Sequence, residues 1–188
     1  MRRALRRRGA LLRWLLAAVL LCLASCVTAV DERDPEGPFI ALGTDFEDFR
    51  EWPRWEIPDI GTSSGHDPGE PRFIYVRDPA PAWGDPFPVG AMIVKTLEVG
   101  APPEWEIHAM AKRGGEYNAE GARGWEWFDL GLSADGRPII LWRGEGTAAD
   151  PGGYVTVEAT GCNACHAVVA GSDYVFTRAV FTPDPEMP

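Results

Sequence analysis

The sequence predicts an α+β fold, in which a small antiparallel β-sheet carries a few flanking helices. Five segments have strand-like length and alternation, and turn-forming stretches such as PAPAWGDPFP, GAPP and SADGRP separate them. The 21 Gly and 17 Pro among the 188 residues also favour turns and short strands over long helices. Short loops between successive strands favour antiparallel pairing, because a parallel pair needs a long crossover connection.

The N-terminal segment, residues 1–25, is typical of a secretory signal peptide. Arginines crowd its start, and an apolar run follows from Leu11 to Leu23 that is too short to span a membrane comfortably. The sequence Leu23-Ala24-Ser25-Cys26 resembles the lipobox of bacterial lipoproteins, which implies cleavage before Cys26 and a diacylglyceryl group on its thiol. The alternatives are an ordinary cleaved signal with a chance cysteine, or an uncleaved anchor.

The charge of the mature chain indicates which partners it can have. When the six arginines of the signal leave, the formal charge of −10 becomes about −16. Such acidity argues against a nucleic-acid partner, because nucleic-acid binding depends on basic side chains that neutralise phosphates. We therefore expect a domain that meets the membrane through its lipid, in the periplasm or at the outer-membrane surface of a bacterial cell envelope.

A short polar tether is expected over residues 26–38, and the folded domain over residues 39–188. The segment TDFEDFREW (44–52) is expected to form one short helix, because Thr44 and Glu47 match a capping box. SSGHDPGEP (63–71) is expected to be a loop from its composition.

The predicted sheet consists of five strands: RFIYVRD (72–78), AMIVKTLEV (91–99), EWEIHAMAKR (104–113), GWEWFDL (124–130) and PIILWR (138–143). In the second of them, alternation places Lys95 on the same face as Ile93, Leu97 and Val99. A buried ammonium is unfavourable unless it is paired, neutralised or used. The lysine is therefore a candidate functional residue.

After an expected loop, GTAADPGGYV (146–155), two cysteines lie in the motif Cys162-Asn163-Ala164-Cys165-His166. The spacing C-x-x-C-H is that of the covalent attachment site of a c-type haem, in which both thiols bond to the haem and the histidine ligates the iron. Haem attachment in bacteria takes place outside the cytoplasm, which agrees with the secretory signal. One motif predicts one covalently bound haem c.

Other uses of these two cysteines fit the sequence less well. A structural disulfide would not need His166, and a thioredoxin-like redox pair would be expected early in a βαβ unit. A zinc site would need four ligands, and only His66 and His108 remain to complete the set.

Three segments together resemble the cytochrome P-460 family, which includes cytochrome c′-beta. They are FPVGAMIVKTLEVG, AMAKRGGEYNAEGARGWEWF and CNACHAVVAGSDYVFTR, which resemble the family's V-K-E-like strand, its M-V-K-R and G-x-W-x-F segment, and its haem motif with a D-Y-V-F-T close. The resemblance covers about residues 44 to 182. It implies a small antiparallel sheet with helices, a homodimer and a five-coordinate c-type haem. Asp173 and Tyr174 are expected to organise the chain after the motif.

The resemblance implies roles for three further residues. Lys95 matches the lysine that is bonded to the haem ring in the P-460 members; alternatively its amine reaches water at a sheet edge. His108 stands where catalytic members have a proton-accepting glutamate, with Glu106 as a second candidate base. Alternatively, His108 ligates the iron or lies on the solvent face. Arg72 matches a distal arginine that could hold a polar ligand, or is a solvated charge at a strand start.

These residues predict redox chemistry of small nitrogen compounds: hydroxylamine oxidation or nitrogen-oxide detoxification at an open haem iron. The partners would be a small molecule such as hydroxylamine or nitric oxide, and an unidentified electron acceptor. One alternative is binding of nitric oxide or carbon monoxide without turnover, as in cytochrome c′-beta. Another is electron transfer, with His108 or Met110 as a sixth iron ligand.

Overall fold

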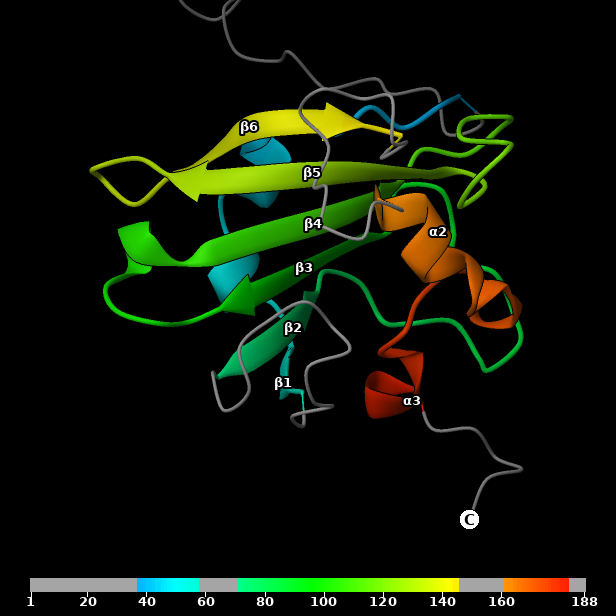
Figure 1. Ribbon diagram of the computed structural model, residues 1–188, viewed down its shortest axis with the longest axis horizontal. Helices are drawn as coiled ribbons and strands as arrows, with labels where there is room; N and C mark the ends of the chain where they lie inside the picture. The colour runs from blue at the N-terminus through cyan, green and yellow to red at the C-terminus, as the bar shows by residue number, and fades with distance from the viewer. Residues whose placement is uncertain (1–36, 58–70, 146–160, 183–188) are drawn as a thin grey trace, which may run out of the picture. The chain divides into compact units, whose positions relative to one another are not determined.

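A six-stranded antiparallel sheet forms the centre of the fold, and the order of its strands in space follows their order along the chain (Figure 1). The computed structural model describes residues 37–57, 71–145 and 161–182. The strands are β1 (Arg54–Glu56), β2 (Arg72–Val76), β3 (Met92–Leu97), β4 (Glu106–Lys112), β5 (Trp125–Leu132) and β6 (Pro138–Gly144).

The five predicted strands are confirmed as β2 to β6, with ends that differ from the prediction by a few residues. Strand β1 was not predicted, because three residues are too few to show an alternating pattern. It pairs with β2, where Trp55 lies opposite Ile74. The expected loops 63–71 and 146–155 lie outside the described residues, except for Pro71.

The helices of the described residues are short. They are the 3₁₀ turns η1 (Gly43–Phe46), η2 (Phe49–Glu51), η4 (Pro102–Glu104) and η5 (Ala170–Ser172), and the α-helices α2 (Gly161–Ala167) and α3 (Arg178–Phe181). None of them is long and apolar enough to cross a membrane. The signal peptide, Cys26 and most of the tether lie outside the described residues.

The expected single helix over residues 44–52 is wrong, because the chain forms the two turns η1 and η2 there. Phe46 and Phe49 are both fully buried, and their spacing of three residues matches the 3₁₀ repeat, so both rings can pack on the sheet. The expected capping box is also shifted. The Asp45 carboxylate accepts a hydrogen bond from the backbone N–H of Leu42, with an N···O distance of 2.7 Å.

The sheet is covered on both faces. We call one the 3₁₀ face: η1 and η2 pack there against an apolar cluster that includes Met92, Val94 and Phe128. We call the other the α2 face: α2 and the residues that follow it pack there (Figure 1), and its apolar cluster consists of Ile74, Val76, Phe87, Ala91, Ile93, Met110, Ala122, Trp125, Trp127 and Val175. The two tryptophans of β5 thus lie on the α2 face and Phe128 on the 3₁₀ face.

The strand register sets the position of Lys95. On β3 it lies between Ile74 of β2 and His108 of β4, and His108 in turn lies opposite Asp129 of β5. These positions alternate with the buried Val94 and Thr96, which belong to the 3₁₀ face. Lys95, His108 and Asp129 therefore form a row across the α2 face.

Candidate functional site

The α2 helix carries the two cysteines and the histidine of the C-x-x-C-H motif. Cys162 packs against the apolar cluster of the α2 face, whereas Cys165 is exposed, and neither thiol forms a disulfide with a described residue. Burial raises the pKa of the Cys162 thiol to about 11, so this group is protonated near neutral pH. The two thiols are separate groups about one helical turn apart.

His166 is held in one tautomer. Its Nδ1 atom lies 2.6 Å from the backbone oxygen of Tyr174, and because a carbonyl oxygen can only accept, Nδ1 carries the proton. Burial lowers the pKa of the ring to about 4, against the effect of this hydrogen bond, and the nearby charge of Lys95 lowers it further. The ring is therefore neutral near pH 7, and Nε2 keeps a lone pair that can bind a metal ion.

Aromatic contacts fix the orientation of the His166 ring. Its centroid lies 4.5 Å from the ring of Trp127 on β5 and 5.1 Å from the ring of Phe176, which follows the motif. These two contacts come from different parts of the chain and meet the imidazole at different angles. They hold the ring in the orientation in which Nδ1 reaches Tyr174.

Asn163, inside the motif, attaches α2 to the rest of the domain. Its Oδ1 accepts hydrogen bonds from Asn118 Nδ2 at 2.8 Å, from Trp127 Nε1 at 2.9 Å and from the N–H of Ala122 at 3.2 Å. A side chain at Gly121 would collide with the Asn163 amide. This role of Asn163 was not predicted from the sequence, because the middle positions of the C-x-x-C-H motif carry no pattern.

Lys95 lies on the α2 face near the motif. Burial lowers the pKa of its amine; the Glu106 carboxylate opposes this shift, and the Arg72 charge adds to it. A smaller effect comes from the Cys165 thiol, and Lys95 in turn affects the pKa of His166. Lys95 is therefore close enough to Cys165 and His166 to interact electrostatically with both.

His108 has a carboxylate near each ring nitrogen. Its Nε2 lies 2.6 Å from Glu106 Oε1, two residues earlier on β4, and its Nδ1 lies 4.0 Å from Asp129 Oδ1 on β5. The side chains of Glu106 and Asp129 are 33% and 42% exposed, so both reach solvent. The two candidate bases of the sequence analysis thus form one hydrogen-bonded pair that is open to water.

Arg72 is buried at the start of β2, with an exposed fraction of 3%. The alternative expectation of a solvated charge at the strand start is therefore wrong. The charge of Arg72 lowers the pKa of the Lys95 amine, so the two side chains lie in the same part of the α2 face. Met110, the weaker candidate for an iron ligand, is buried in the apolar cluster of this face, opposite Ile93 and Trp127.

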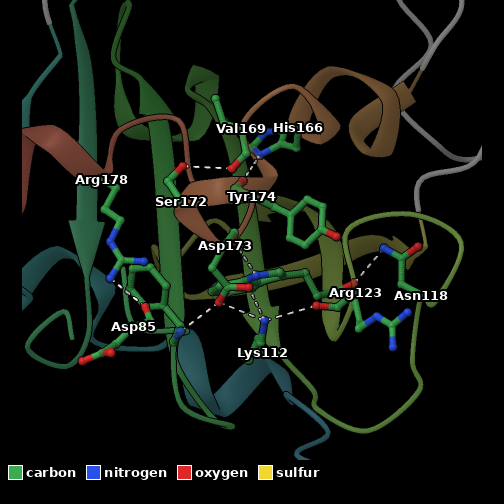
Figure 2. A network of polar contacts seen from close by, with 12 residues as sticks. Asp85, Lys112, Asn118, Arg123, His166, Val169, Ser172, Asp173, Tyr174 and Arg178 are labelled. Atoms are coloured by element: carbon green, nitrogen blue, oxygen red, sulfur yellow. Dashed lines mark hydrogen bonds and ion pairs between the residues drawn. The ribbon is translucent and has the colours of Figure 1, made fainter. Parts of the chain in front are cut away.

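A second polar network follows the motif and was only partly expected. As the sequence suggested, Asp173 and Tyr174 organise this stretch: Asp173 pairs with Lys112 of β4, and Tyr174 binds His166 (Figure 2). The partner Lys112 was missed, although it occupies the lysine position of the M-V-K-R-like segment. Only the tertiary structure shows that this lysine contacts the chain after the motif.

The described residues contain no group of three or more His, Cys, Asp and Glu side chains that could hold a metal ion. His66, one of the two histidines that could complete a zinc site, lies outside the described residues. A single histidine is enough for a haem, which brings its own ring nitrogens to the iron. No family model, curated protein or solved structure matches the chain.

Proposed function

We propose that this chain is an exported, lipid-anchored cytochrome that holds one c-type haem through Cys162, Cys165 and His166. The residues fit such a group, because neither thiol forms a disulfide with a described residue and Nε2 of His166 carries a lone pair rather than the proton. The anchor would be Cys26. The proposed location is the bacterial cell envelope, and the motif would acquire its haem outside the cytoplasm.

The haem would supply one-electron chemistry at its iron atom, where a small ligand would bind. The chain would supply binding, orientation and proton transfer. His166 would hold the iron, with its ring oriented by Tyr174, Trp127 and Phe176. Arg72 would provide positive charge on the same face of the sheet, and Lys95 would be the residue bonded to the haem ring.

We infer that the substrate is a small nitrogen compound, with hydroxylamine as the first candidate and an unidentified protein or molecule as electron acceptor. The observation that carries this inference is the Glu106–His108 pair beside Lys95. Oxidation of hydroxylamine to nitric oxide releases as many protons as electrons, so the site needs a proton acceptor. His108 would accept such a proton, and the carboxylates of Glu106 and Asp129, which both reach solvent, would pass it to water.

Binding of nitric oxide or carbon monoxide without turnover is the second candidate. It is favoured by the apolar residues around Lys95, because Ile74 and Ile93 on the same face are both buried. A diatomic gas is held well by such surroundings and needs no base. An electron-transfer role would need a sixth ligand, and Met110 is packed in the apolar cluster instead. A homodimer is proposed from the resemblance alone.

The first test is the absorption spectrum of the reduced protein, made with a haem-attachment system, beside that of Lys95→Ala. A red-shifted Soret band that is lost in Lys95→Ala would support the lysine–haem bond and hydroxylamine oxidation. An ordinary high-spin c-haem spectrum in both would contradict the bond and favour gas binding. A wild-type protein without covalent haem would overturn the proposed function.

The sequence provides an internal control for this bond, because Lys95 and Lys112 are the only lysines of the chain. Amine-specific labelling of the denatured protein, followed by peptide mass spectrometry, should modify Lys112 fully. If Lys95 is bonded to the haem ring, it should stay unlabelled and its peptide should carry the haem mass. Equal labelling of both lysines would show that the amine of Lys95 is free.

A further inference from the structure

Lys112, at the end of β4, forms a buried ion pair with Asp173. Its Nζ atom lies 2.7 and 2.9 Å from the two carboxylate oxygens and donates a further hydrogen bond of 3.1 Å to the backbone oxygen of Arg123 (Figure 2). Gly124 leaves room for this side chain, because a Cβ there would lie 3.1 Å from Lys112 Cε. Burial lowers the pKa of the amine, and the Asp173 carboxylate opposes that shift.

Asp173 is held by donors from other segments as well. Its carboxylate accepts a hydrogen bond from the N–H of Phe87 at 2.8 Å, and its backbone oxygen accepts one from Trp125 Nε1 at 2.9 Å. Strand β4, strand β5 and the chain before β3 therefore all contact this one residue. Such a set of contacts fixes both the side chain and the backbone of Asp173.

The backbone at this point has an unfavourable conformation. Asp173 and Tyr174 have φ angles of 53° and 66°, in the left-handed region that residues other than glycine rarely adopt. This turn directs the Tyr174 carbonyl to His166 Nδ1, and the N–H of Tyr174 donates to the backbone oxygen of Val169 at 3.1 Å. The contacts of Asp173 stabilise a turn that would otherwise relax.

We propose that Lys112 and Asp173 form a positioning pair for His166. The pair keeps the left-handed turn in place, the turn keeps the Tyr174 carbonyl at Nδ1, and that hydrogen bond sets the electron-donating strength of Nε2. The inference rests on the proposed function, in that it takes His166 as the iron ligand. The Lys112 and Asp173 side chains bond to each other, whereas His166 Nδ1 bonds to the Tyr174 carbonyl, so the pair acts on His166 through the backbone.

The direction of the effect follows from the chemistry of imidazole. A hydrogen bond from Nδ1–H to a carbonyl makes the ring a stronger donor, which favours the oxidised iron. Loss of the pair should weaken that bond, lower the iron–histidine stretching frequency and raise the midpoint potential. Removal of the positive charge of Lys112 would by electrostatics alone lower the potential, because it favours the more positive, oxidised iron. The sign of the change therefore separates the two effects.

The experiment compares the holoprotein with Lys112→Met, and with Arg143→Met as a matched control. Arg143 forms an ion pair of 2.7 Å with the buried Glu126 on the 3₁₀ face, so this control also breaks a buried pair. The measurements are resonance Raman spectra of the reduced protein and the midpoint potential. We expect Lys112→Met to lower the stretching frequency and raise the potential, and Arg143→Met to leave both at their wild-type values.

Asp173→Asn, a variant of equal size, keeps the test decisive if Lys112→Met does not fold. It should lower the same stretching frequency, since it removes the charge that holds Lys112. An unchanged frequency in either folded variant, or a lower potential in Lys112→Met, would overturn the inference and leave the proposed function intact. A wild-type protein that carries no haem would overturn both.

Discussion

The two faces of the sheet are built from alternate residues of the same strands, yet they differ in chemistry. On the 3₁₀ face, fully buried rings such as Phe46 and Phe49 pack against Met92 and Val94. On the α2 face, the apolar cluster is interrupted by titratable side chains and meets the C-x-x-C-H motif. Both lysines of the chain point to this second face.

This difference indicates that the two faces have different roles, one in stability and the other in the candidate site. Because successive side chains of a strand point to opposite sides, the two faces can carry different sets of charged groups. The 3₁₀ face has its own ion pair, Arg143 with the buried Glu126, but Arg143 also binds the backbone oxygen of Ala41 and contributes to packing. We expect changes on the 3₁₀ face to alter stability, and changes on the α2 face to alter cofactor binding and activity.

The largest effect should come from the double variant Cys162→Ser and Cys165→Ser, made in a Lys95→Ala background so that no lysine–haem bond can form. Without thiols no thioether bond to the haem can form, so the expected result is complete loss of covalently bound haem. The measurement is haem staining after denaturing electrophoresis. The control is Cys26→Ser, which should lose the lipid, detected by mass spectrometry, and keep the haem. Haem that stays covalently bound in the double variant would contradict the assignment of the motif.

The next effect concerns turnover. His108→Ala removes the proposed proton acceptor, and we expect hydroxylamine oxidation with an artificial electron acceptor to fall by about 10²–10⁴-fold. Glu116→Gln, which changes an exposed carboxylate, is the control and should keep the wild-type rate. A wild-type rate in His108→Ala would show that His108 is not the proton acceptor. A wild-type protein that does not oxidise hydroxylamine would favour gas binding.

A substitution on the 3₁₀ face should act on stability alone. Phe49 is fully buried and its ring centroid lies 5.3 Å from that of Tyr75, so Phe49→Ala leaves a cavity. We expect the free energy of unfolding to fall by about 3–5 kcal/mol, measured by urea denaturation. The haem spectrum of the folded variant should match the wild type. A shifted spectrum would show that the two faces are coupled.

The smallest effect is a pH dependence caused by His166. Its pKa is lowered to about 4 in the folded state, so between that value and its ordinary pKa the unfolded chain binds more protons. The haem-free Cys162→Ser, Cys165→Ser variant should therefore lose stability as the pH falls from about 6.5 to about 4, by up to about 3 kcal/mol. Urea denaturation at several pH values measures it. Addition of His166→Gln should flatten this dependence, and an equal slope with and without His166 would contradict it.

Local sequence patterns predicted much of this architecture. Alternation located five of the six strands and the face on which Lys95 lies, because both depend only on residues that are close in the chain. The same approach missed β1, which is too short for a pattern, and predicted one helix where two 3₁₀ turns form. There, the packing of Phe46 and Phe49 on the sheet overrides local helix signals.

By itself the sequence determined five of the six strands and their antiparallel pairing, the spacing of the motif cysteines and the residue types of the candidate site. Only the tertiary structure decided that His108 lies opposite Asp129, that Asn163 joins Asn118 45 residues earlier, and that Lys112 meets Asp173 61 residues later. Side-chain periodicity is a local property of a strand. Contacts between distant residues depend on how loops close and elements pack, and no short pattern in the sequence records them.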